Sequence, residues 1–99
     1  MKIYLVTGEM GEYSDRMEWL VCAYASRELA EKHMRAANAW IEDTKSKYDD
    51  WFDFRNAVRE KETSSPYDPG LEDVYSLDGV EYCVSGVELR DELPKLTGA

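Results

Sequence analysis

The chain has 99 residues, of which 43% are apolar and 33% are charged, and its formal net charge at pH 7 is −9. This length predicts a single domain over residues 1–99 with one hydrophobic core, and three tryptophans with seven tyrosines exclude a disordered acidic tail. The negative charge disfavours direct binding to nucleic acid or to an anionic membrane, because both carry negative charge themselves.

No apolar run approaches the roughly 20 residues that a membrane-spanning helix needs, and the start MKIYLVTGEM lacks the basic, long apolar pattern of a secretory signal. We therefore expect a soluble, cytoplasmic protein. Cys22 and Cys83 lie in apolar, strand-like runs and form neither a CxxC pair nor a Cys/His cluster. In such a chain this pattern predicts reduced core residues rather than a disulfide or a metal site.

Two strands are predicted near the N-terminus, at residues 2–7 (KIYLVT) and 17–25 (MEWLVCAYA), because their apolar residues alternate and many are β-branched or aromatic. The stretch GEYSDRMEW, which begins at Gly11, joins them. Gly8 and Gly11 supply turn geometry, and Arg16 can pair with a neighbouring acid. This stretch has no nucleophile–base pair, so we interpret it as a hairpin connection.

A helix is predicted over residues 27–47, where apolar residues recur at helical spacing and Ser26 can accept hydrogen bonds from the free amides of the first turn. From Tyr48 onward either this helix continues or a second one begins, capped by Asp49 or Asp50. Residues 63–70 end the helical part, because two prolines and a glycine occur within five residues.

Asp78 and Gly79 predict a further turn, followed by a last strand at residues 80–89 with an irregularity at Gly86 and then a loose tail. The order strand, strand, helix, strand predicts an α+β fold. Its sheet would be three-stranded and antiparallel in the order 2-1-3, with one long helix or two consecutive helices packed on one face.

Catalytic patterns are weak in this chain. The only histidine, His33, lies on the apolar stripe of the predicted helix with no serine or cysteine near it in sequence, which predicts a partly buried structural residue. An enzyme would need a concave site that gathers His33 with Cys22 or Cys83 and an acid. Neither GxGxxG nor GK[ST] occurs. We therefore predict a protein that is not an enzyme and uses no cofactor.

The run DDWFD contains Asp49, Asp50 and Asp53. On a helix, Asp49 or Asp50 would share a face with Asp53, and carboxylates placed in this way can bind hard cations. We interpret these acids instead as a helix cap followed by a solvated face, with no metal.

The excess of acids predicts a partner with a basic surface, and residues 66–99 alone contain eight acids against two bases. Carboxylates on such a surface can take the positions of phosphates in the groove of a nucleic-acid-handling protein. The residues predicted to bind the partner are Glu42, Asp43, Asp49, Asp50 and Asp53, with Glu72 and Asp73 as a second acidic group.

An alternative function stays open, namely a structural or regulatory interaction module. Such a module could be a homodimer that associates through its sheet or through exposed aromatic residues such as Trp51 and Phe52.

Several motifs together resemble a group of small, mostly uncharacterised bacteriophage proteins. They are the KIYLV start, GEYSDRMEW, ELAEKHMRAANAW, the YDP at residues 67–69 and YCVSGVEL, and residues 43–64 match least well. The resemblance implies a strand pair, a central helix and a short last strand. It also implies an accessory protein that binds and inhibits a host protein in the host cytoplasm, as anti-CRISPR and anti-restriction proteins do, and it carries no catalytic residues.

Overall fold

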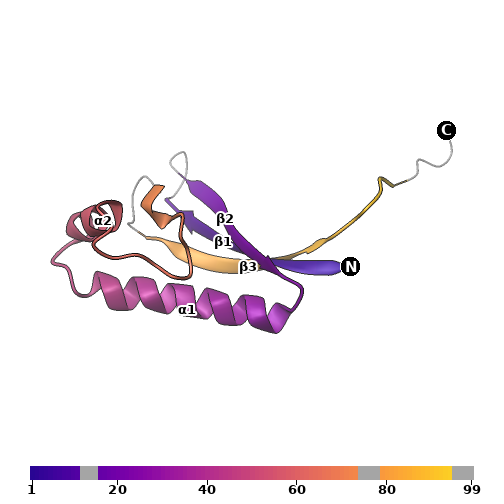
Figure 1. The fold of residues 1–99 in the computed structure, drawn as a ribbon, viewed down its shortest axis with the longest axis horizontal. Coiled ribbons are helices and arrows are strands. Elements are labelled where there is room, and N and C mark those ends of the chain that lie inside the picture. The colour runs from indigo at the N-terminus through magenta and orange to yellow at the C-terminus, as the bar shows by residue number, and fades with distance from the viewer. Residues whose placement is uncertain (12–15, 74–78, 95–99) are drawn as a thin grey trace.

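The computed structural model describes residues 1–11, 16–73 and 79–94, and it has two layers, a sheet and a helical layer (Figure 1).

The sheet contains β1 (Lys2–Met10), β2 (Met17–Tyr24) and β3 (Glu81–Glu88). Both neighbouring pairs are antiparallel and the strand order is β2-β1-β3, which confirms the predicted α+β fold and its topology. The first strand continues three residues beyond the predicted end at residue 7, because its alternation of buried and half-buried residues continues to Met10.

Helix α1 (Arg27–Lys45) lies along one face of the sheet (Figure 1). It begins as predicted, because the Ser26 hydroxyl oxygen accepts a hydrogen bond of 3.3 Å from the Leu29 amide. The buried residues of this helix include Ala30, Ala37 and Ile41, which follow one another at helical spacing.

A second helix, α2 (Trp51–Arg59), is separate from α1. The carboxylate of Asp50 caps it by accepting a hydrogen bond of 2.9 Å from the Asp53 amide, so the chain starts a new helix instead of continuing the first. A short 3₁₀ helix, η2 (Leu71–Asp73), follows the proline-containing turn and packs against α2.

The main core lies where β1, β3, α1, α2 and η2 meet. Phe54 of α2 is fully buried there, with the rings of Trp40 and Tyr48 about 6 Å from its own. The buried members of this cluster are Met10, Ala37, Ile41, Phe54, Val58, Leu71 and Tyr82.

A row of three residues crosses the sheet on its helix-facing side. Gly8 in β1 pairs with Trp19 in β2 on one side and with Tyr82 in β3 on the other. The Trp19 indole covers Gly8 so closely that a Cβ atom built there would lie 2.5 Å from Trp19 Cζ2. Glycine is therefore needed at position 8 by the packing of Trp19, and the prediction that it shapes the turn was wrong.

Helix α1 is fixed to the edge of the sheet by Asn38. Its side-chain amide donates a hydrogen bond of 3.1 Å to the Tyr82 carbonyl and accepts one of 2.8 Å from the Tyr82 amide. Both backbone groups of Tyr82 are satisfied in this way, although β3 is an edge strand.

The prediction of an irregularity at Gly86 is wrong. Strand β3 pairs with β1 in unbroken register there, with Gly86 opposite Tyr4, and the register shift lies instead in the β1–β2 pair, between Val6 and Thr7. Gly86 has another reason to be small: a Cβ atom at this position would lie 2.9 Å from the end of the Lys2 side chain.

The prediction for the two cysteines holds in part. Both are free thiols, as expected. Cys22 is half-buried, but Cys83 is exposed and is not a core residue. Its position in β3 places it on the face of the sheet opposite α1, where its sulfur lies 3.2 Å from the hydroxyl of Thr7.

The hairpin stretch is described in part. Arg16 forms ion pairs with Glu9 at 3.0 Å and with Glu18 at 2.7 Å, which confirms its predicted role. Gly11 has a φ of 81°, as a turn glycine does. Residues 12–15 of this stretch lie outside the described residues, as do residues 74–78 with Asp78 of the predicted turn.

Replacing Gly8 by alanine should destabilise the protein by about 1–3 kcal/mol, because the new methyl group would meet the Trp19 ring. Urea denaturation followed by circular dichroism measures the change. The matched control is Gly70→Ala, whose Cβ atom would meet only Asp68 Oδ1 at 3.8 Å. Equal stability of the Gly8→Ala variant and wild type would show that Trp19 does not hold this position.

Candidate functional site

Two of the predicted acids lie together in a hollow beside the start of α2. Asp49 and Asp53 line a cavity of about 410 Å³ with Glu60 and Glu62, which come from the end of α2 and the residues after it. All four carboxylates are exposed, and Lys47 is the one basic residue in this lining. We call this group of residues the acidic hollow. Glu60 and Glu62 were not among the predicted acids. Asp53, Asn56 and Glu60 nevertheless follow one another at the three- and four-residue spacing of a single helix face, so this spacing could have identified Glu60.

The other predicted acids near this hollow have different positions. Glu42 and Asp43 are exposed in the last turn of α1, and their backbone carbonyls accept hydrogen bonds from Ser46. Asp50 caps α2, so its charge also stabilises the positive end of that helix. Substituting Asp50 would therefore change folding as well as surface charge.

The second predicted acidic group is divided between two surroundings. Glu72 lies 3.9 Å from the ammonium of Lys61, whereas Asp73 is exposed and lines a different cavity, next to β2. Over residues 1–11, 16–73 and 79–94, no group of three or more Asp, Glu, His or Cys side chains is arranged to hold a metal ion.

A buried carboxylate that was not predicted, Asp68, is only 3% exposed. Its Oδ2 atom accepts hydrogen bonds of 2.9 Å from Trp19 Nε1 and of 2.7 Å from the Tyr82 hydroxyl. Asp68 lies between the two prolines of the turn, and such a position is usually exposed. The tryptophan and tyrosine that bind it are distant in sequence, so no local pattern reveals the group.

Asp68 also lines a cavity of about 220 Å³ between β2 and the segment that precedes η2. We call it the Trp19 pocket. Its lining consists of Met17, Trp19, Leu20, Val21, Asp68, Pro69, Gly70 and Asp73.

His33 and Cys22 lie near one another, the arrangement that would favour an enzyme. His33 Nε2 is 2.7 Å from the Tyr67 carbonyl and therefore donates to it, while Nδ1 is 2.8 Å from the Tyr24 hydroxyl. The Cys22 sulfur is 3.8 Å from Nε2. Burial, with the charge of Asp68, raises the pKa of Cys22 and keeps it a thiol, which is the opposite of what a nucleophile needs. His33 thus connects α1 to β2 and to the turn, as a partly buried structural residue.

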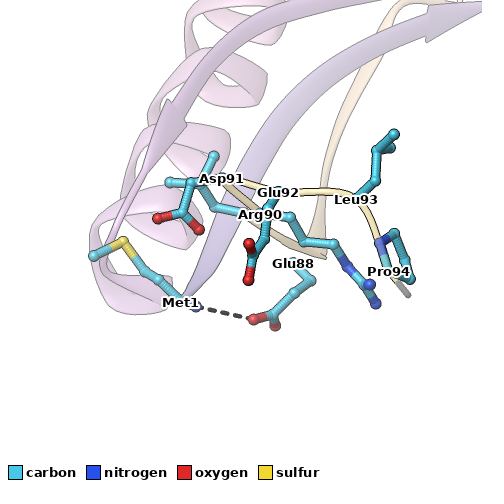
Figure 2. A pocket seen from close by; sticks show the side chains of 8 residues that line it. Met1, Glu88, Arg90, Asp91, Glu92, Leu93 and Pro94 are labelled. Carbon is cyan, nitrogen blue, oxygen red and sulfur yellow. Dashed lines mark hydrogen bonds and ion pairs between the residues drawn. The ribbon is translucent and has the colours of Figure 1, made fainter.

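A third hollow, of about 600 Å³, lies where the tail leaves β3 (Figure 2). Its wall is formed by Met1 and by residues 88–94, all of which are exposed, and the Met1 ammonium pairs with Glu88 at 2.9 Å. Because none of these side chains is buried, this hollow is less defined than the other two.

No protein-family model, no curated protein and no solved structure matches this chain. Among the described residues, no helix is long and apolar enough to cross a membrane.

The free energy of unfolding should fall at alkaline pH because of Tyr82. Burial, with the hydrogen bond and charge of Asp68, raises the pKa of Tyr82 above its ordinary value of 10.0. Above that pH the unfolded chain loses a proton that the folded chain keeps, so the free energy of unfolding falls by up to about 1.4 kcal/mol per pH unit.

Urea denaturation between about pH 8 and about pH 11 measures this slope. The control is Tyr82→Phe, which should be less stable at neutral pH and should show a smaller alkaline decline. Equal declines in the two proteins would contradict the assignment to Tyr82.

Proposed function

We propose that this protein is a small acidic accessory protein of the bacteriophage type. It binds a basic surface on a host nucleic-acid-handling protein and inhibits it, as anti-CRISPR and anti-restriction proteins do. The observation that best supports this proposal is the acidic hollow, which gathers four exposed carboxylates around one concave surface with a single ammonium in its lining.

The position of the charges matters more here than their number. Residues 42–62 contain seven acids and five bases, so this region is only weakly acidic as a whole. Four of these acids nevertheless line one hollow, and Glu42 and Asp43 are exposed in the last turn of α1. Carboxylates that line one surface can take the positions of phosphates on lysine and arginine side chains, and complementary charge also speeds association.

The proposed activity needs neither a cofactor nor a catalytic residue. The raised pKa of Cys22 and the structural hydrogen bonds of His33 support binding rather than catalysis, because both groups are engaged in holding the fold.

Neutralising the acidic hollow should weaken partner binding and reduce its dependence on salt. The test variant is Asp49→Asn with Asp53→Asn, and the matched control is Asp91→Asn with Glu92→Gln on the tail, which removes the same charge far from the hollow (Figure 1). Asp50→Ser separately removes charge while keeping a capping oxygen.

Tagged wild type should capture nucleic-acid-binding proteins from a bacterial lysate, and added DNA or RNA should displace them. Binding of the captured protein to each variant is then measured at low and high salt. If the hollow variant and the tail variant bind alike, the interface lies elsewhere. If nucleic acid does not compete, the partner's basic groove is not the target.

A second candidate function, the homodimer, is favoured by the face of the sheet opposite α1. Leu20 of β2 is 63% exposed on this face and Val87 of β3 is 38% exposed, with Leu5 half-buried between these strands. An apolar sheet face of this kind is a common dimer interface.

If this face forms a dimer, light scattering should give twice the mass of one chain, and Leu20→Lys should restore the monomer. The control is Leu93→Lys on the tail, where the native leucine is 89% exposed. A wild-type protein that stays monomeric at high concentration would exclude the dimer.

A further inference from the structure

We propose that the Trp19 pocket binds one arginine side chain of a partner protein. The pocket lies against β2 and is a different surface from the acidic hollow, so this inference does not rest on the proposed function.

The lining of the pocket has the chemistry that a cation on an apolar stem requires. Most of its wall is apolar and comes from Met17 and Val21 of β2, together with the Trp19 ring and Pro69. Its charged groups are two carboxylates, and none of the eight lining residues is basic. The apolar wall can cover the methylene groups of a long side chain, while the carboxylates attract its charged end.

The buried carboxylate is held in a fixed position. Both groups that donate to Asp68 Oδ2, the Trp19 indole and the Tyr82 hydroxyl, are neutral, so they orient the carboxylate without cancelling its charge. The other oxygen, Oδ1, lies on the Gly70 side, where a Cβ atom would approach it at 3.8 Å. Gly70 also lines the pocket, so no side chain projects from position 70 toward this oxygen.

Asp73 supplies the second carboxylate at a more exposed position. It belongs to η2, which also carries buried Leu71, so its backbone is held by the core while its side chain stays accessible. One buried and one exposed carboxylate can bind different N–H groups of the same guanidinium, which presents five donors in a plane.

Other ligand classes fit this lining less well. A divalent cation prefers six or more oxygen ligands, whereas apolar carbon forms most of this wall. An anion or a nucleic acid would be repelled by the two carboxylates. Arginine also stacks on aromatic rings such as the Trp19 indole, an interaction that a simple metal ion with its water shell does not make.

The test uses N-acetyl-arginine amide as the probe and N-acetyl-citrulline amide as its neutral counterpart of the same shape. Both are titrated into the full chain while the indole N–H signals are followed by nuclear magnetic resonance. The Trp19 indole donates to Asp68, so its signal should move and saturate with the arginine probe, with a dissociation constant on the order of millimolar. The indole signal of Trp51, which lies on α2, should stay in place.

Asp73→Asn should weaken binding of the arginine probe about threefold to tenfold, because it removes one carboxylate and leaves the core unchanged. The matched control is Asp91→Asn on the tail, which removes the same charge outside both proposed surfaces and should bind the probe as wild type does. Equal shifts with arginine and citrulline, no saturation, or equal affinities of the two variants would overturn the proposal. The acidic hollow is tested by a different experiment, so either proposal can fail alone.

Discussion

The buried carboxylate of Asp68 is the group on which the arrangement of this protein depends. Removing a carboxylate from water is costly unless hydrogen bonds replace its hydration. Here the indole of Trp19 and the hydroxyl of Tyr82 replace it, and these residues belong to the two outer strands. They lie on either side of Gly8 in the central strand, so one carboxylate connects the proline-containing turn to both outer strands.

Helix α1 is tied to the same region by two further polar contacts. Asn38 bonds the backbone of Tyr82, and His33 bonds the carbonyl of Tyr67, the residue before Asp68. The sheet, the helix and the turn therefore meet around one set of satisfied polar groups. Such a set specifies a single packing of its elements, because breaking any member leaves a buried group without a partner. The Trp19 pocket is carried by elements held in this way, whereas the acidic hollow lies beside α2.

Much of the fold could be predicted from local patterns. Alternation identifies β1 and β2, helical spacing with Ser26 identifies α1, and Asp50 is the kind of residue that begins a new helix. The strand order then follows from chain geometry. Residue type predicted local structure less well at two positions. Gly86 lies in a regular strand, where its small size allows close packing. Cys83 is exposed, because a strand has two faces and only one face of this sheet is covered.

The candidate sites could be predicted only in part. Asp49 and Asp53 were identified from their charge, and the helical spacing of Asp53, Asn56 and Glu60 could have added Glu60. The position of Glu62 depends instead on how the chain leaves α2. Asp68 was read as part of a turn, and nothing local shows that a turn residue is buried under Trp19 and Tyr82. Concave sites depend on which distant segments meet, and the sequence pattern of one segment does not contain that information.

Asn38 also affects how this sheet can meet other chains. Its amide occupies both backbone hydrogen-bonding positions of Tyr82, as a residue of a fourth strand would do. A peptide or a second sheet that paired with β3 at this point would first have to displace a side chain held by two hydrogen bonds. Pairing of a further strand with β3 is therefore disfavoured at this position. A strand from another chain would pair more readily with β2, so the sheet would be extended on one side only.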